Sequence, residues 1–314
     1  MELPPPSSAA SVSSSGDLMR TILSFVRRLS DAVRLRSCCK AWRATLLDGD
    51  DAAAHLFAKV SVRFNRRVKD VTLRSTFAST LLRKLEVTGC AAVTDIGLSW
   101  LCVAATNLEE LDISRCELVS NVGLEYVGWY CRALTSLDVS HLPLINDGEH
   151  QFHCPALRHF CCANTGIGNL CIETLAQRCL RLETVHAART AVGARGLWAL
   201  ANHCTDLQQI CLDECSNAYN PNDRLPEEGF ADDHIRDDGL RFLAERCPRL
   251  EVVECAHAGD VGDAGVLALL DQCPFLRRVG LWGCAEVTAE AVAALQRRGV
   301  DVSHGLARTC QVAL

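Results

Sequence analysis

The stretch Leu108-Glu-Glu-Leu111-Asp-Ile113-Ser-Arg-Cys116 decides the fold of this chain, because its pattern returns at regular intervals. Apolar residues occupy its first, fourth and sixth positions, and Cys often occupies the ninth. The same stem begins at Leu82, Leu108, Leu134, Leu157, Leu182, Leu207, Leu250 and Leu276. Successive stems start 26, 26, 23, 25, 25, 43 and 26 residues apart. A period of this length predicts a solenoid built from stacked repeats.

Each repeat contains two kinds of periodicity. Apolar and polar residues alternate within the stem, as in a strand with one buried face. Beyond the stem from Leu108, Val122, Leu124 and Val127 fall at helical spacing, and Cys131 closes the helix. Neither layer can bury its apolar side alone, so neighbouring repeats must stack to form the core. We therefore predict an α/β fold, a right-handed horseshoe arc with parallel strands on the concave face and the wider helices on the convex face.

Two repeats depart from the regular length. The repeat from Leu134 is short, and its outer part, residues 142–153, contains a Pro and a Gly and leaves little room for a helix. The repeat from Leu207 carries an insertion at about residues 217–233, and solenoid insertions emerge as loops. We assign residues 82–304 to the repeat array and residues 305–314 to a C-terminal cap or tail.

The segment before the array has a different character. Residues 1–16 are rich in Pro, Ser and Ala, which predicts disorder. Residues 17–59 show apolar residues at helical spacing, which predicts a small module of three short helices. Residues 60–81 form a transition. Within it, Val68-Lys-Asp-Val71-Thr-Leu73 matches the stem loosely and suggests a degenerate first strand.

Composition argues against several classes of function. The chain has 314 residues, 49% of them apolar, and a net charge of -6, so it lacks the basic character typical of nucleic-acid binding. No apolar run reaches the length of about 18 residues needed to span a bilayer. The N-terminal residues do not resemble a secretory signal. We expect a cytoplasmic or nuclear protein, or one present in both compartments, that binds neither nucleic acid nor membrane.

Most of the 19 cysteines are explained by the repeat. Six lie three residues before a stem Leu, and four lie eight residues after one: Cys131, Cys154, Cys179, Cys204, Cys247, Cys273, and Cys90, Cys116, Cys215, Cys284. Equivalent positions of stacked repeats align, and a free Cys packs as a small hydrophobic residue. We therefore expect packing thiols rather than disulfides or a metal site.

Alternation along the strands places the third, fifth and seventh stem positions on the concave face. The candidate partner-binding residues there are Glu86, Glu110, Asp112, Asp138, His159, His186 and Trp282. The four carboxylates lie within three repeats, and they form either a solvated surface or a binding site for a basic segment of a partner. Trp282 is either a binding anchor or a residue packed beneath the terminal cap.

The same face suggests one further possibility. Cys161, His186 and Cys211 occupy the fifth position of successive stems, and these are residue types that bind zinc. Neighbours in a straight row do not converge tetrahedrally, so we expect no metal and no cofactor. A soft polar pocket that senses a small molecule is the alternative for these residues. No catalytic motif is present, and an open arc offers no enclosed cleft, so we expect a non-catalytic protein.

The cysteine-bearing repeats, over residues 82–304, resemble the cysteine-containing subtype of leucine-rich repeats. Ala92-Val-Thr-Asp-Ile-Gly-Leu98 matches the "VTDxGL" segment of that subtype. The front module resembles an F-box, and Cys38-Cys-Lys-Ala-Trp42 is its best match, to the pattern "VCKxW". The usual "LP" opening of the F-box is absent, and Gly16-Asp17 stands in its place.

Together the two parts resemble an F-box/leucine-rich-repeat protein, a substrate receptor of Skp-cullin-F-box ubiquitin ligases. The resemblance implies that the front module binds the Skp adaptor and, through it, the cullin, while the arc holds the protein to be ubiquitylated. The residues expected at the adaptor are Leu18, Ile22, Leu23, Val26, Leu35 and Trp42. The alternative is a free-standing repeat scaffold outside any ligase, with the front module serving only to cap the solenoid.

Overall fold

A computed structural model describes residues 58–77, 80–148, 153–215, 234–258 and 260–303. Their strands form one ten-stranded parallel sheet in which the spatial order follows the chain order. The strands are β1 (Lys59–Ser61), β2 (Lys84–Glu86), β3 (Glu110–Asp112), β4 (Ser136–Asp138), β5 (His159–Cys161), β6 (Thr184–His186), β7 (Gln209–Cys211), β8 (Val252–Glu254), β9 (Arg278–Gly280) and β10 (Asp301–Ser303).

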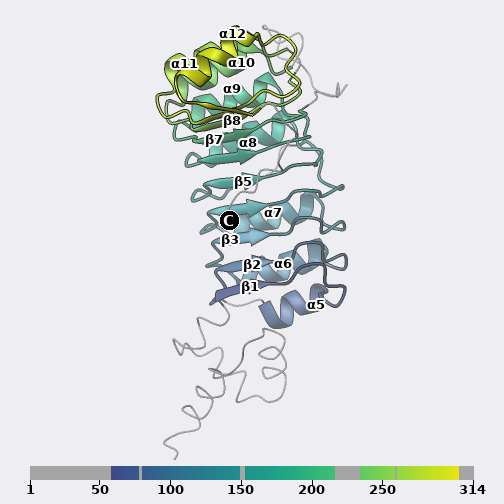
Figure 1. The fold of residues 1–314 in the computed structure, drawn as a ribbon. Coiled ribbons are helices and arrows are strands. Elements are labelled where there is room, and N and C mark those ends of the chain that lie inside the picture. Colours follow the sequence, from purple (N-terminus) through teal and green to yellow (C-terminus); the bar gives the residue numbers. More distant parts are fainter. Residues whose placement is uncertain (1–57, 78–79, 149–152, 216–233, 259, 304–314) are drawn as a thin grey trace, which may run out of the picture.

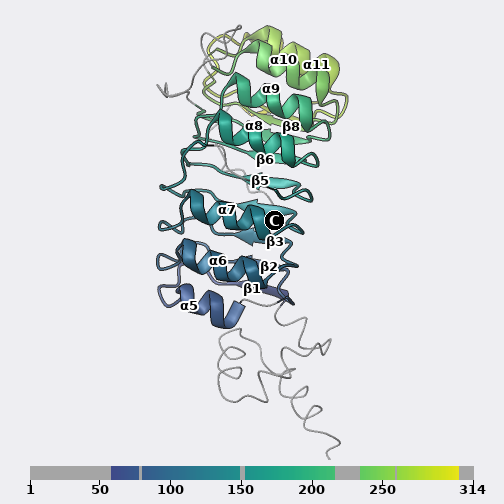
Figure 2. The same cartoon turned by 180° about the vertical axis from the view of Figure 1, so that it is seen from behind.

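Helices alternate with these strands and lie together on the other side of the sheet (Figures 1 and 2). They are α5 (Asp70–Thr72), followed by the π-helical turn η1 (Leu73–Phe77), then α6 (Asp95–Ala104), α7 (Asn121–Tyr130), α8 (Asn169–Arg178), α9 (Ala194–His203), α10 (Asp237–Arg246), α11 (Asp263–Gln272) and α12 (Ala289–Arg297). The predicted α/β solenoid, with its separate strand and helix layers, is confirmed.

The core runs along the stack between the two layers. In β2 and β3 the central residue is buried and its two neighbours are partly exposed. The register pairs Leu85 with Leu111 and Leu111 with Leu137, so the central side chains form a continuous row. Because the burial of each repeat depends on the next one, the core extends through the whole stack rather than closing within one repeat.

The first strand lies earlier than the sequence pattern suggested. Residues 68–73 are not a strand, because α5 and η1 occupy this segment. The strand is β1, whose Val60 pairs with Leu85 and is 2% exposed. Lys59, which we had assigned to the front module, is part of this strand. The chain from Val68 to Leu73 instead corresponds to Val93 through Leu98, 25 residues later, at the start of a helix.

The "VTDxGL" segment has a structural explanation at this helix start. The Thr94 hydroxyl caps α6 by accepting a hydrogen bond from the Ile96 amide. The Asp95 carboxylate accepts hydrogen bonds from the backbone N–H of Ser120 at 2.8 Å and from its hydroxyl at 2.6 Å. A Cβ on Gly123 would lie 2.5 Å from Asp95 Oδ1, so this position needs a residue without a side chain. The carboxylate therefore ties one repeat to the next.

This contact recurs along the stack. In each case an Asp or Asn near the start of one repeat's outer segment accepts a hydrogen bond from the helix N-cap backbone of the following repeat. The acceptors and donors are Asp70 to Thr94, Asp95 to Ser120, Asp147 to Gly168, Asn169 to Gly193, Asp237 to Gly262, and Asp263 to Thr288. We call these residues the inter-repeat acceptors. They satisfy helix N–H groups that have no partner within their own helix.

The short repeat from Leu134 has no helix in its described residues, 134–148 and 153–156, before β5 begins. In Figure 2, α7 and α8 are correspondingly separated at the level of β5. The prediction that this repeat has no room for a helix is confirmed for these residues. Asp147 nonetheless accepts hydrogen bonds from the backbone N–H groups of Gly168 and Cys171, so the stack stays tied across this repeat.

The repeat cysteines are free thiols that pack in the core. Within the described ranges, every cysteine except Cys161 and Cys215 is buried. Their thiols donate weakly to carbonyls of the preceding repeat; Cys116 Sγ, for example, lies 3.1 Å from the Val87 carbonyl oxygen. Burial raises the pKa of Cys179 to about 11 and the pKa of Cys204 to about 12. These thiols stay protonated at neutral pH.

Several segments assigned from the sequence lie outside the described residues. They are the expected disordered segment 1–16, the front module up to residue 57, the insertion at 217–233 and the tail at 305–314. All six predicted adaptor-binding residues fall in that front part: Leu18, Ile22, Leu23, Val26, Leu35 and Trp42. Their assignment stays a prediction.

A candidate partner-binding face

The face of the sheet that points away from the helices carries the candidate site, and we call it the sheet face. The register aligns the third residue of each strand in one column, which runs Glu86, Asp112, Asp138, Cys161, His186, Cys211, Glu254 and Gly280. The first residue of each strand forms a parallel column that includes Lys84, Glu110 and His159. Six of the seven predicted partner-binding residues therefore share two neighbouring columns.

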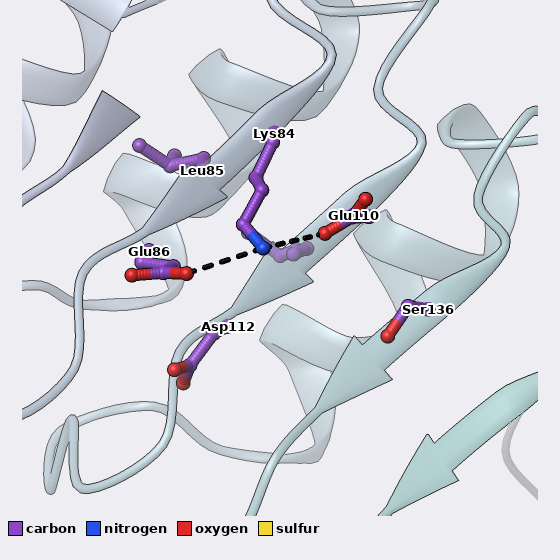
Figure 3. A pocket seen from close by; sticks show the side chains of 7 residues that line it. Lys84, Leu85, Glu86, Glu110, Asp112 and Ser136 are labelled. Atoms are coloured by element: carbon purple, nitrogen blue, oxygen red, sulfur yellow. Dashed lines mark ion pairs between the residues drawn. The ribbon is translucent and has the colours of Figure 1, made fainter. Parts of the chain in front are cut away.

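The acidic end of this face contains a cation of its own. Lys84 Nζ lies 2.7 Å from Glu110 and 3.3 Å from Glu86, as Figure 3 shows. The hydrogen bond to Glu110 raises the pKa of Lys84. These ion pairs place a positive charge between two carboxylates that the sequence pattern predicts to be available to a partner.

Glu86 is also bound from the first strand. The Ser61 hydroxyl donates to it at 2.6 Å, and the Arg63 guanidinium at 3.0 Å. Burial on its own would raise the pKa of Glu86, but the hydrogen bonds from Ser61, Arg63 and Lys84 outweigh it and lower that pKa. Glu86 therefore stays ionised at neutral pH, and its charge is shared with groups of the same chain.

Asp112 is held by neutral donors instead of cations. The Thr88 hydroxyl donates to its carboxylate at 2.7 Å, and the backbone N–H and hydroxyl of Ser114 donate at 2.8 and 2.6 Å. Asp138 accepts a hydrogen bond from the backbone N–H of Ser140 at 2.8 Å. Burial raises the pKa of Asp138. Both carboxylates thus shape the turn that follows their strand while they contribute negative charge to the sheet face.

A shallow hollow joins these groups. It is lined by Lys84, Leu85, Glu86, Glu110, Leu111, Asp112 and Ser136 (Figure 3). Its polar wall comes from three adjacent strands, so a segment lying across β2, β3 and β4 would meet all of them. This arrangement suits a basic or hydrogen-bonding segment of a partner, because carboxylates are acceptors only when ionised.

The middle of the sheet face is less charged. His159 Nδ1 lies 3.2 Å from the Thr184 hydroxyl oxygen. Cys161 Sγ lies 3.1 Å from His186 Nδ1 and 3.0 Å from Ser140 Oγ. The described residues contain no group of three or more His, Cys, Asp or Glu side chains placed to hold a metal ion.

Trp282 is at the other end of the sheet face. It is 39% exposed, and its ring meets His257 edge to face with 4.4 Å between the ring centroids. A half-exposed aromatic ring held by a neighbour is a typical anchor for a partner. The structure therefore places Trp282 at the surface of the described residues, together with a histidine that sequence reasoning did not select.

A second row of charged side chains was also missed. The backbone φ angle is positive at the eighth residue of six stems: Arg115, His141, Asn164, Arg189, Glu214 and His257. It is also positive at Phe64, which follows β1. Arg115 Nη2 lies 3.1 Å from His141 Nε2, and Arg189 makes two hydrogen bonds to Glu214, of 3.0 and 2.8 Å. Burial, followed by the charges of Arg115 and Arg189, lowers the pKa of His141. In the sequence, this row could have been found from its recurring position, immediately before the repeat Cys.

These observations define a leucine-rich-repeat fold with an open, polar sheet face. Residues 78–102 and 104–128 match the family model described as Leucine Rich repeat. Among solved structures, the crystal structure of the Rad7 and Elc1 complex in yeast is similar, with 19% identity and a TM-score of 0.40. That similarity covers 89% of this chain and 79% of the other chain. Every helix in the described ranges is too short or too polar to span a bilayer.

Proposed function

We propose that this protein is a non-catalytic substrate receptor of a Skp-cullin-F-box ubiquitin ligase. In this proposal residues 17–59 bind the Skp adaptor and, through it, the cullin, and the sheet face binds the protein to be ubiquitylated. The protein acts in the cytoplasm, the nucleus or both, and neither nucleic acid nor membrane is a partner. Its contribution to the reaction is effective concentration, because it holds a substrate lysine near the loaded conjugating enzyme.

One observation carries the substrate-binding half of the proposal. The sheet face presents one set of side chains from each of ten adjacent strands, and its acidic end combines Glu86, Glu110 and Asp112 in one hollow. Such a surface can bind an extended segment by charge and hydrogen bonding without a closed pocket. The adaptor-binding half rests on the F-box-like residues, among which Cys39-Lys-Ala-Trp42 stands immediately ahead of the repeats.

A pull-down with a recombinant Skp adaptor tests the proposal. The full-length protein should bind the adaptor, and Trp42→Ala should reduce binding about tenfold or more, since a buried interface aromatic is worth roughly 2 kcal/mol or above. Trp198→Ala is the matched control, because Trp198 is an exposed aromatic of the helix layer, 46% exposed and far along the chain from the front module.

Circular dichroism must show that both variants remain folded. Absence of adaptor binding by the folded wild-type protein would contradict the ligase proposal. It would instead support the second candidate, a free-standing interaction scaffold. The missing "LP" opening, where Gly16-Asp17 stands, is the specific observation that favours this second candidate.

A further inference from the structure

Cys161 differs from the other cysteines of the described chain. Only Cys161 and Cys215 are half-buried there, and the remaining thiols are buried in the core. Cys161 also lies on the sheet face, as the third residue of β5. Cys211 occupies the same column on β7 but is only 4% exposed, so Cys161 is the more accessible thiol of this column.

Two polar side chains from neighbouring strands approach this thiol. The register places Cys161 opposite His186 on β6 and opposite Asp138 on β4. The Cys161 Sγ atom lies 3.1 Å from His186 Nδ1 and 3.0 Å from Ser140 Oγ. Ser140 is 6% exposed, and its hydroxyl also donates to the Asp138 carboxylate.

This geometry allows the thiol proton to pass directly to the imidazole. In the neutral pair the thiol donates to Nδ1. After transfer, the thiolate accepts from the Nδ1–H of the imidazolium. Hydrogen bonds to the charged form of a group stabilise that form. The Asp138 carboxylate stabilises the imidazolium, although its negative charge also opposes formation of the thiolate. On the other side of His186, the next residue of the column is Cys211.

We propose that Cys161 is a nucleophilic thiol, activated by His186, and that it is a modification site for small soft electrophiles of the α,β-unsaturated carbonyl class. A cysteine within hydrogen-bond reach of a histidine, and partly open to solvent, is the arrangement that activates thiols in proteins. The open sheet face admits a small planar reagent and selects it by reactivity rather than by the shape of a pocket.

The reaction is an addition. The Cys161 sulfur forms a bond to the β carbon of the reagent, and the electrons of the carbon–carbon double bond move to the carbonyl oxygen as an enolate. The proton held by the His186 imidazolium is delivered to the α carbon, which restores the carbonyl. Nothing is oxidised or reduced, and no group leaves. The adduct would stand on the sheet face between β4 and β6.

Cys215 provides an internal comparison. Cys215 is half-buried, as Cys161 is. Its Sγ, however, lies 3.0 Å from the Ala187 carbonyl oxygen, to which the thiol donates. This acceptor favours the protonated thiol. Burial raises the pKa of Cys215. Two half-buried thiols of one molecule thus differ in whether a basic side chain lies within hydrogen-bond reach.

N-ethylmaleimide, an α,β-unsaturated dicarbonyl, tests the proposal on the full-length protein. The protein is treated with limiting reagent at pH 7, quenched at intervals and digested, and the modification of each cysteine is followed by mass spectrometry. We expect Cys161 to react about tenfold or more faster than Cys215, because only Cys161 has a basic partner. His186→Gln should slow Cys161 by about tenfold or more, since glutamine cannot accept the proton.

The rate at Cys215 is the control for global loosening and should not change in His186→Gln. His186→Phe, which also removes the accepting nitrogen, should slow Cys161 as well and serves as the test if His186→Gln does not fold. Equal rates at Cys161 and Cys215 in the wild-type protein would overturn the proposal. An unchanged Cys161 rate in a folded His186→Gln or His186→Phe protein would overturn it as well.

Discussion

At the scale of single residues, the inter-repeat acceptors explain why an Asp or Asn and a Gly recur at matching positions in several repeats. Asp95 accepts from Ser120, and Gly123 leaves room for that carboxylate. The residue types are therefore set by a contact between repeats rather than by helix propensity. An ordinary capping residue satisfies its own helix, whereas here the acceptor comes from the repeat before.

Two adjacent aspartates on α10 allow this contact to be measured. Asp237 accepts the Gly262 N–H at 2.7 Å, whereas the neighbouring Asp238 side chain is 73% exposed and pairs with Arg241. Asp237→Ala should lower the free energy of unfolding by about 1–3 kcal/mol, the usual cost of leaving a buried donor without a partner. Asp238→Ala should cost about 0.5 kcal/mol or less, because exposed ion pairs contribute little.

Both aspartates lie in the first helical turn, so the effect of the helix dipole is the same in the two variants. Urea denaturation followed by circular dichroism measures the difference. Equal losses of stability would mean that the inter-repeat hydrogen bond contributes nothing beyond the charge at the helix start.

At the scale of elements, β1 is the edge that closes the front of the sheet. Its Val60 is 2% exposed, while Lys59 and Ser61 on either side are exposed. An edge strand without a neighbour leaves a row of N–H and C=O groups unpaired. Val60 is the one buried side chain of β1, and it adds apolar packing against Leu85 of β2 to the backbone pairing and the Ser61–Glu86 hydrogen bond.

The variants Val60→Asn and Lys59→Asn place the same residue at adjacent positions of this strand. Val60→Asn should reduce the free energy of unfolding by about 2–4 kcal/mol, from lost apolar burial and a buried amide. Lys59→Asn should change it by about 0.5 kcal/mol or less. Hydrogen exchange should also show faster exchange in β2 for Val60→Asn alone. Similar protection of β2 in both variants would show that β1 is not needed there.

At the scale of the whole molecule, the buried thiols should lower the free energy of unfolding at alkaline pH. Burial raises the pKa of Cys116, Cys204 and Cys247 to about 12 and that of Cys179 and Cys273 to about 11. In the unfolded chain these thiols ionise near pH 8.5. Below that pH both states are protonated and the full stability is present. Above it only the unfolded state loses protons, so stability falls as pH rises toward the folded-state pKa.

The expected loss is about 1.4 kcal/mol per pH unit for each such thiol. The Tm of the reduced protein should therefore fall steeply between about pH 8.5 and pH 10. Cys204→Ala is less stable at pH 7, but its stability should decline less per pH unit, because one titrating group has been removed. Thermal melts in a phosphine reductant measure both slopes. Parallel slopes for the two proteins would show that the buried thiols do not control the alkaline response.

The sequence by itself determined the period, the alternation of strand and helix, and the row of side chains on the sheet face. These follow from local spacing, because residues 25 or 26 positions apart occupy equivalent places in a stack. Even the early strand had a signal, since Phe57-Ala-Lys-Val60-Ser-Val62 stands 25 residues before the stem from Leu82. The loose match at Val68 concealed it, because apolar residues at that spacing also fit a helix start.

Only the tertiary structure decided which groups on that face are already paired. The ion pair of Lys84 with Glu110, and the contacts of Cys161 with Ser140 and His186, join residues of different repeats. Their residue types follow no repeat rule, so spacing places them in a column without indicating which side chains meet. Hydrogen bonds of about 3 Å depend on side-chain rotamers and on the twist between neighbouring strands. Neither of these can be read from the period of the sequence.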